Sequence, residues 1–398
     1  MHTIKILDTS YAAEAHALNN YSFPEFAGSD TVEGFASWLE STPCFGEFED
    51  GVLQSKIHVI PMTFRLEDVE YKSTGIGAVG TYPEARGKGG IRRLFERILA
   101  WEKEEGVVLS FLGPFSYEFY KKFGYERIFE TLTLTWSMEA FPDGKRQAGT
   151  IKRLSFEDAL PYMTTLYHED ELSKGFGAIR NKEQWNDKGW KDKDIHIAVY
   201  FDTAGEATGY VVYSFTVDTF TIKEIIHGDQ EALLALAQYI KVHGANAHKV
   251  VYTSHNPRTS EIPLYQLTEA LFDCQMSLRP RMQMRIVDVE KFLQAYPYQK
   301  VLDVTIDQIP LFKQCSIQVL DRTAPWNQAI FDLRGKRLDQ AREKHVILSV
   351  EALTLWFSGY KKSPELIMVG EIETNEREAC KVIDQFLASR VPAMTEDF

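Results

Sequence analysis

The 398-residue chain lacks the features that mark secreted, membrane-spanning and metal-binding proteins. Its four cysteines, Cys44, Cys274, Cys315 and Cys380, are far apart and form no CxxC pair. We expect them to be buried, reduced thiols and neither disulfides nor metal ligands. No apolar run approaches the roughly 20 residues of a membrane-spanning helix, and the N-terminal residues lack the basic and apolar regions of a signal peptide. These absences predict a cytoplasmic protein with no membrane partner and no metal.

Positive charge is scarce as well. The chain has 44 lysines and arginines against 57 aspartates and glutamates, a formal net charge of −13. A surface of this sign repels nucleic acid and attracts cationic ligands, although ions in solution screen both effects. We therefore expect no nucleic-acid partner.

The composition is otherwise that of a globular protein, with 44% hydrophobic and 25% charged residues and no low-complexity tract. A chain of this length exceeds one core of ordinary size, so two or three domains are expected. The polar stretch 139–149 (EAFPDGKRQAG) closes a first block at about residue 150. The second block contains the apolar strands 195–200 and 209–215 and repeats the order of elements of the first, which suggests a duplicated α/β unit.

A run of glycines and cations stands at the start of one predicted helix. Residues 76–81 (IGAVGT) indicate a short apolar strand, PEARGKGG follows, and residues 107–112 (VVLSFL) predict the next buried strand. Between them, apolar residues recur with the helical period. This apolar stripe consists of Ile91, Leu94, Phe95, Ile98 and Leu99, and Gly106 is the expected C-terminal cap.

The position of these glycines and cations favours a phosphate ligand. The first N–H groups of a helix have no partner within the helix, and its dipole is positive at that end. Glycine lets the backbone approach a ligand closely, while arginine and lysine add charge. Neither the P-loop nor the Rossmann pattern is present, and a solvated helix face is the alternative. The predicted phosphate-binding residues are Arg86, Gly87, Lys88, Gly89, Gly90 and Ile91.

The segment RGKGGI resembles the acyl-CoA pyrophosphate loop of the GNAT acetyltransferases, R/Q-x-x-G-x-G/A, with Ile91 at the position of the small sixth residue. After the strand 107–112, the segment 119–125 (FYKKFGY) is similar to an FYxKxGF-like segment of the same enzymes. The resemblance implies acetyl-CoA as co-substrate. It also implies that backbone N–H groups near Val79 and Thr81 position the pantetheine and thioester, and that Tyr125 protonates the leaving thiolate.

Segments further along, among them RMQMRIVDVEKFLQAYP and LSVEALTLWFSGYKKSPEL, resemble the enhanced-intracellular-survival (Eis) acetyltransferases. This resemblance implies an α/β (α+β) fold with two tandem GNAT-like domains, residues 1–150 and 151–284, followed by a sterol-carrier-protein-like α/β domain, residues 285–398. It also implies a homo-hexamer. In the second domain, Asp229 stands where a phosphate loop would begin, and an aspartate there caps the helix but repels phosphate. Only the first domain is therefore expected to bind CoA.

The Eis resemblance further implies that the terminal carboxylate of Phe398 acts as the general base, whereas chain ends are more often frayed. It places the acceptor pocket at Phe23, Glu25 and Trp38, where aromatic rings would attract a cationic amine; a place in the helix core is the alternative for Trp38. The expected acceptor is an aminoglycoside-like molecule, a polyamine or a lysine side chain. The rival hypotheses are a non-catalytic ligand- or lipid-binding protein on the same scaffold and a dedicated protein lysine acetyltransferase.

Overall fold

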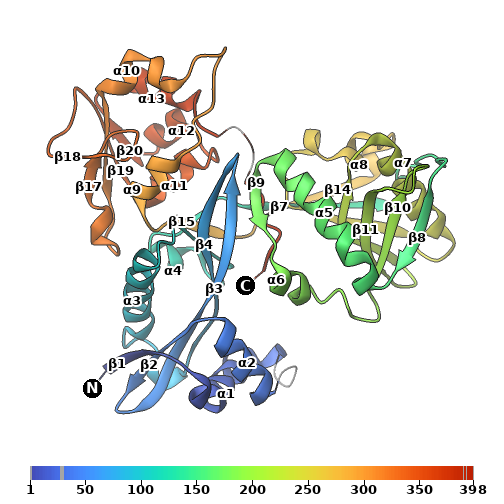
Figure 1. Ribbon diagram of the computed structural model, residues 1–398, viewed down its shortest axis with the longest axis horizontal. Helices are drawn as coiled ribbons and strands as arrows, with labels where there is room; N and C mark the ends of the chain where they lie inside the picture. Colours follow the sequence, from blue (N-terminus) through green and yellow to red (C-terminus); the bar gives the residue numbers. More distant parts are fainter. Residues whose placement is uncertain (1, 27–30, 389, 391, 398) are drawn as a thin grey trace. The chain divides into compact units, whose positions relative to one another are not determined.

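The computed structural model describes residues 2–26, 31–388, 390 and 392–397 of the chain, which form two compact units (Figure 1). The first unit combines Met1–Ile128, Met282–Ser389 and Asp397–Phe398, and the second combines Phe129–Arg281 with Arg390–Glu396. All four cysteines are buried and free, as expected. Among the described residues, no helix has the length and apolar character needed to cross a membrane.

One mixed sheet organises the N-terminal part of the first unit. Its strands run in the order β1-β2-β3-β4-β5-β15-β6, and only β4 and β5 are parallel among these neighbours. The strand β15 comes from far along the chain and lies between β5 and β6. The strands are β1 (His2–Ile6), β2 (Cys44–Glu49), β3 (Val52–Leu66), β4 (Val69–Thr81), β5 (Leu109–Leu112), β6 (Glu126–Arg127) and β15 (Gln283–Ile286).

Two groups of helices accompany this sheet. The helices α1 (Ala12–Ser22) and α2 (Val32–Ser41) share one apolar cluster with β2 and β3. The helix α3 (Gly90–Glu104) and the short α4 (Tyr117–Lys121) belong to a second cluster. The predicted stripe of α3 is confirmed, since Leu94, Phe95, Ile98 and Leu99 are fully buried and Ile91 is half-buried. Gly106 follows the helix with a φ of 77°, the left-handed conformation expected after a helix end.

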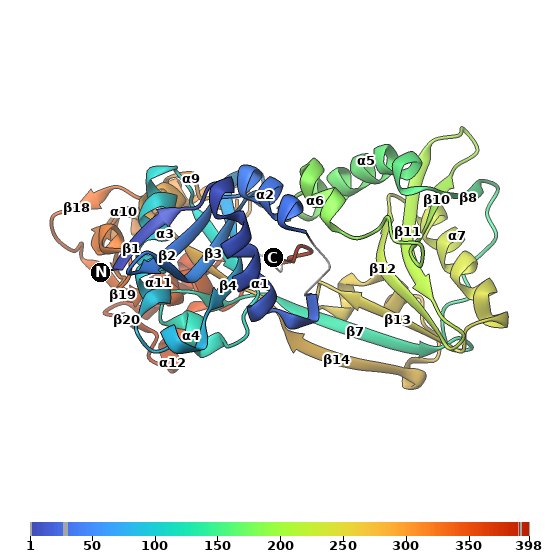
Figure 2. The same cartoon turned by 90° about the horizontal axis from the view of Figure 1, so that it is seen from below.

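The second unit is built on a seven-stranded sheet in the order β14-β7-β13-β12-β11-β10-β8. Figure 2 shows β7 and β14 side by side. Asp229 caps α7 by accepting from the Ala232 N–H at 2.7 Å, as its position predicted. The strands of this sheet are β7 (Glu130–Ser137), β8 (Thr150–Leu154), β10 (His196–Phe201), β11 (Ala207–Phe215), β12 (Thr219–His227), β13 (Lys249–Ser254) and β14 (Cys274–Pro280). The unit also contains the strand β9 (Phe176–Ile179), which is not part of this sheet, and the helices α5 (Phe156–Lys174), α6 (Lys182–Asp187), α7 (Gln230–Lys241) and α8 (Pro263–Gln266).

The chain enters the second unit earlier than its composition suggested. The polar stretch 139–149 is a loop, but it lies inside the second unit because β7 already pairs there with β13 and β14. At the other end, β15 returns to the first sheet at residues 283–286. The sequence of an apolar strand does not show which of two sheets the strand joins. The polar stretches therefore predicted where loops lie, but not where one unit ends and the next begins.

The rest of the first unit is a five-stranded sheet, in the order β18-β17-β16-β19-β20, with its own helices. Its strands β16 and β19 are parallel, and the other pairs are antiparallel. With its three mixed sheets the chain has the α/β fold expected from its sequence. The elements are β16 (Cys315–Leu320), β17 (Ala329–Phe331), β18 (Arg337–Leu338), β19 (Lys344–Ser349), β20 (Ile372–Thr374), α9 (Val289–Ala295), α10 (Pro310–Gln314), α11 (Val350–Phe357), α12 (Ser363–Met368) and α13 (Arg377–Asp384).

Candidate active site

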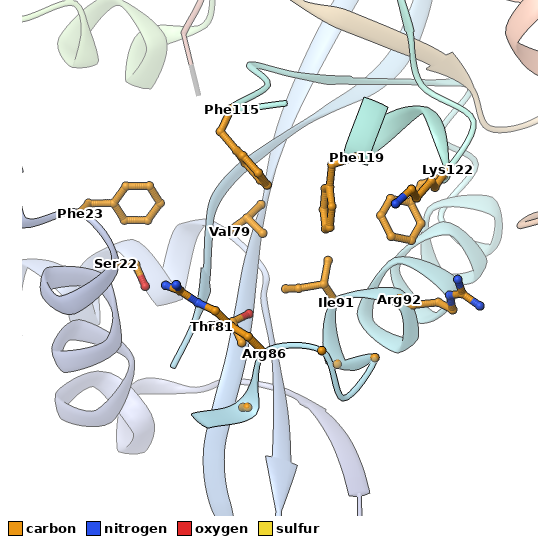
Figure 3. Close-up of a pocket in the computed structure, with 15 residues that line it drawn as sticks. Ser22, Phe23, Val79, Thr81, Arg86, Ile91, Arg92, Phe115, Phe119 and Lys122 are labelled. Carbon is orange, nitrogen blue, oxygen red and sulfur yellow. The ribbon is translucent and has the colours of Figure 1, made fainter. Parts of the chain in front are cut away.

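The first unit contains a cavity of about 830 Å³ bordered by the end of β4, the loop after it and the segment around α4 (Figure 3). Val79 and Thr81, which were predicted to lie near the thioester, line it from β4. Ser22 and Phe23 line it from the end of α1. The cavity therefore lies where the predicted phosphate loop, the strand β4 and the end of α1 converge.

The loop between β4 and α3 has the geometry that its glycines permit. Gly87 and Gly89 adopt φ angles of 79° and 81°, in the left-handed region that favours glycine. A Cβ on Gly90 would overlap a carboxylate oxygen of Glu47, so a larger residue at the first position of α3 would require the Glu47 side chain to move. All three glycines line the cavity, and the free N–H groups of the first turn of α3 begin there.

The cations of this loop divide into two kinds. Arg86 lines the cavity, and its guanidinium has no hydrogen-bond or ion-pair partner among the described residues. Lys88 was expected to bind phosphate too, but its Nζ lies 2.9 Å from Glu49 and the residue does not line the cavity. Arg92, in the first turn of α3, lines the cavity although the sequence did not single it out. The positive charge at the cavity is therefore that of Arg86 and Arg92, together with Lys122, which lines it from the end of α4.

An aromatic wall closes the cavity on the side of α4. It consists of Phe115, Phe119 and Phe123, and Figure 3 shows Phe115 and Phe119 with Val79 and Ile91 beside the space that they enclose. Phe115 is 76% exposed. The segment FYKKFGY was expected at this site, but only its last tyrosine was given a role. Phenylalanines in a short amphipathic stretch are indistinguishable from core residues by sequence alone.

Neither of the two tyrosines of this segment lines the cavity, but their surroundings differ. Tyr125 is fully buried, its hydroxyl lies 2.7 Å from the Ser110 hydroxyl, and it does not line the cavity. Tyr120 packs against two wall residues, with ring centroids 5.4 Å from Phe115 and 5.1 Å from Phe119. Its hydroxyl makes no hydrogen bond to any residue that the structure describes. Burial raises the pKa of both tyrosines, so both are protonated at neutral pH.

The residues predicted to form an acceptor pocket are only partly brought together. Phe23 lines the cavity, whereas Glu25 is exposed and does not line it. Trp38 is stacked on His58, with ring centroids 3.7 Å apart, and packs edge-on against Phe35. Phe398 lies outside the described residues.

Three family comparisons match successive parts of the chain. Residues 3–128 match an acetyltransferase (GNAT) domain, residues 177–286 match a second acetyltransferase (GNAT) domain, and residues 289–395 match a sterol carrier protein domain. The first match contains every residue that lines the cavity. The protein is a GNAT-family acetyltransferase. The expected order of two tandem GNAT domains and a sterol-carrier-like domain is confirmed.

Solved structures resemble the acetyltransferase along its whole length. A conserved protein of unknown function from Enterococcus faecalis V583, a probable N-acyltransferase, is 27% identical with a TM-score of 0.89, and each chain is covered completely (100%). A GCN5-related N-acetyltransferase from Anabaena variabilis (TM-score 0.84) and Eis1 from Mycobacterium abscessus (TM-score 0.79) are each 18% identical over 100% of both chains, and their likeness is one of fold. No curated protein sequence matches the chain.

A buried carboxyl group lies next to Tyr125 in the acetyltransferase. Glu102 of α3 is fully buried and accepts hydrogen bonds from Thr74 and, at 3.0 Å, from Ser110, while its second oxygen has no partner within the described residues. Burial raises the pKa of Glu102 from 4.5 to about 7, although both hydrogen bonds and Arg285 act in the opposite direction. The folded state therefore keeps a proton at pH values where the unfolded chain has lost it.

This shift predicts how stability depends on pH. Because the folded pKa of Glu102 lies above the unfolded one, its contribution to the free energy of unfolding falls as pH rises from 4.5 to about 7. Glu102→Gln removes the ionisation, so it should raise the free energy of unfolding by about 1–3 kcal/mol at pH 8 and leave it nearly unchanged at pH 4.5. Urea denaturation of both proteins at the two pH values measures this. Equal gains at both values would contradict the assignment.

Residues near the end of the chain, up to Glu396, are anchored inside the second unit. Glu396 is 4% exposed and lies 2.7 Å from the Arg180 Nε and 3.1 Å from the Lys188 Nζ. Arg180 also pairs with Glu224 at 2.6 Å, and Lys188 donates to the Thr395 carbonyl at 2.7 Å. Although burial acts in the opposite direction, Arg180 and Lys188 lower the pKa of Glu396 from 4.5 to about 2. The tail is therefore held through Glu396, which sequence reasoning did not single out.

Proposed function

We propose that the acetyltransferase is Eis-like and moves the acetyl group of acetyl-CoA to an amine of a cationic acceptor in its first GNAT domain. The observation that carries this proposal is the unpartnered Arg86 beside a glycine turn and a helix start on the wall of a large cavity. A CoA pyrophosphate needs cations and free N–H groups, and the cavity has both. The residues present thus fit acetyl-CoA.

Each lining group has a role in this proposal. The N–H groups at the start of α3, with Arg86 and Arg92, would hold the pyrophosphate. The β4 backbone near Val79 and Thr81 would position the pantetheine and the thioester, and Phe115 and the other wall residues would exclude water. Holding the two reactants in line lowers the barrier of a transfer between them. Bound acetyl-CoA supplies the acetyl group as its thioester.

A tyrosine of the segment 119–125 would protonate the leaving thiolate. Tyr125 is the residue that the family resemblance favours, but its hydroxyl is engaged by Ser110. Tyr120 touches two residues of the cavity wall and has no competing hydrogen bond among the described residues, so we favour Tyr120 as the general acid. The terminal carboxylate of Phe398 stays our proposal for the general base.

The acceptor is proposed to be a small polyamine, an aminoglycoside-like molecule or a lysine side chain. Phe23 borders the cavity on the side opposite the aromatic wall in Figure 3, where a ring would favour a cation. Glu25 and Trp38 are part of the same proposal only through the family resemblance. A homo-hexamer is likewise proposed from that resemblance, and the cytoplasmic location stays an expectation from the sequence.

The test compares acetyl-CoA binding by two variants of this loop, one at Arg86 and one at Lys88. Arg86→Ala should raise the acetyl-CoA Kd roughly 10- to 150-fold, because a charge-assisted hydrogen bond contributes about 1.5–3 kcal/mol. Lys88→Ala is the matched control, since Lys88 pairs with Glu49 outside the cavity, and its Kd should change less than about threefold. Calorimetry measures both.

The same proteins are then screened for CoA release with polyamines, aminoglycosides and lysine peptides. Release with at least one amine is expected. Equal Kd values in the two variants would show that the loop does not bind phosphate and is a solvated helix face. Acetyl-CoA binding with no release on any amine would favour the non-catalytic ligand-binding alternative.

A further inference from the structure

A lysine is buried behind the strand that forms one wall of the cavity. Lys56 of β3 is 0% exposed. Its Nζ donates to the side-chain oxygen of Asn19 in α1 at 2.9 Å and to the backbone carbonyl of Ala78 in β4 at 3.1 Å. It also lies 5.4 Å from the ring centroid of Phe35 in α2. One ammonium group therefore joins two helices to the cavity strand.

The carbonyl that Lys56 binds belongs to an irregular point of β4. Lys56 pairs with Gly80 and His58 pairs with Gly77, so two residues of β4 stand opposite one residue of β3. This is a β-bulge, an arrangement that changes where a strand presents its backbone and side chains. Ala78 in the bulge has a φ of 47°, which is unfavourable for any residue with a Cβ. Val79 follows it and lines the cavity.

The surroundings of Lys56 offer it no opposite charge. No carboxylate among the described residues forms an ion pair with it. The ionisable groups whose charges interact with Lys56 are Cys44 of β2, whose thiol pKa burial raises to about 12, and His58 of β3, whose pKa burial and the Lys56 ammonium lower well below its usual value. Both are uncharged at neutral pH. Burial lowers the pKa of Lys56 itself to about 8, so it is mostly protonated there.

Packing alone does not explain a lysine at this position. A buried ammonium without a carboxylate loses its hydration, and an unbranched apolar side chain of similar length would fill the space without that penalty. Methionine is such a side chain, but it has no hydrogen-bond donor for the Asn19 side chain and the Ala78 carbonyl. Those two bonds fix the bulge relative to α1, whose last residue, Ser22, lines the cavity together with Phe23.

We infer that Lys56 is a positioning residue for acetyl transfer, which holds the Ala78 bulge and α1 in the arrangement that aligns Val79 with the bound thioester. Lys56 does not line the cavity, so it acts through the strand and not on the reactants. The inference rests on the transfer reaction proposed above. It predicts a defect in turnover and not in acetyl-CoA affinity.

The test compares Lys56→Met with Lys72→Met in the full-length protein. Lys72, in β4, is a matched control because its side chain is 56% exposed and does not line the cavity. Lys56→Met should lower kcat about 10- to 100-fold, the usual result of misplacing reactants slightly, while the KM and Kd for acetyl-CoA stay within about threefold. Its melting temperature should not fall. Hydrogen exchange of the amides of residues 77–81 should become about tenfold faster or more.

Asn19→Ala removes one of the two hydrogen bonds of Lys56 and should lower kcat and speed up hydrogen exchange by smaller factors. If Lys56→Met does not fold, the Asn19 variant tests the inference. Unchanged kcat and unchanged exchange in these variants would overturn the inference. A loss of acetyl-CoA affinity in step with kcat would also overturn it, because the defect would then be one of binding. Absence of transfer by the wild-type protein would instead overturn the proposed function and the catalytic part of this inference, while the exchange data would still decide whether Lys56 holds the bulge.

Discussion

Tyr120→Phe should lower the kcat of acetyl transfer by about 10²–10⁴-fold, with little change in the Kd for acetyl-CoA. The substitution removes one oxygen from a residue that packs against Phe115 and Phe119 on the cavity wall, and the ring contacts stay in place. Burial raises the pKa of Tyr120, so the hydroxyl carries its proton until a leaving thiolate takes it. Steady-state kinetics and calorimetry measure the two quantities.

Tyr125→Phe is the comparison that makes this result specific. The Tyr125 hydroxyl lies in the buried network of Ser110 and Glu102, so its loss should lower the free energy of unfolding by about 1–3 kcal/mol and kcat by less than about tenfold. The reverse pattern, with a large kcat loss only in Tyr125→Phe, would identify Tyr125 as the general acid. Full activity in both variants would assign the proton to water.

Arg180→Met should destabilise the second unit by about 3–5 kcal/mol, because it leaves the buried carboxylates of Glu224 and Glu396 without their main partner. It also removes a guanidinium that lies 3.9 Å from the ring centroid of Tyr167. For a unit of this size the melting temperature should fall by about 6–20 °C. Differential scanning calorimetry at pH 7 measures the shift.

Arg258→Met is the control for charge removal in the same unit. Arg258 pairs with Glu261 at 3.1 Å, but both side chains are about half exposed (47% and 45%), and such pairs contribute about 0–1 kcal/mol. A fall in melting temperature of equal size in both variants would show that the Arg180 cluster contributes no more than a surface pair. The Arg180 variant should also release the tail, which limited proteolysis after residue 389 would report.

The sequence was sufficient where a feature depends on neighbours in the chain. The glycines at 87, 89 and 90 and the apolar stripe of α3 predicted the turn, the helix and the direction of its buried face, because each depends on a few consecutive residues. The Asp229 cap of α7 was predictable for the same reason.

The sequence was insufficient where a residue's role depends on a distant partner. Lys88 was predicted to bind phosphate because the sequence does not show that β2, which carries Glu49, lies beside the loop. Glu396 was overlooked because its partner Arg180 is more than 200 positions away (a separation of 216). Phe115 and Phe119 are of a residue type that is common in cores, and only their place on the cavity wall distinguishes them from core residues.

The position of β15 in the first sheet has a consequence for how the chain is made. The first GNAT domain cannot close its sheet until residues 283–286 pair with β5, and Gln283 then donates to the carbonyls of Tyr117 and Tyr125, at 3.2 and 3.0 Å. The ribosome must first synthesise about 150 residues of the second unit, which takes roughly 8–30 s at about 5–20 residues per second. During that interval β5 is an open apolar edge, the kind of strand that recruits wrong partners. A fragment that ends at residue 128 would keep this nascent state permanently, so the first GNAT domain is not a portable module.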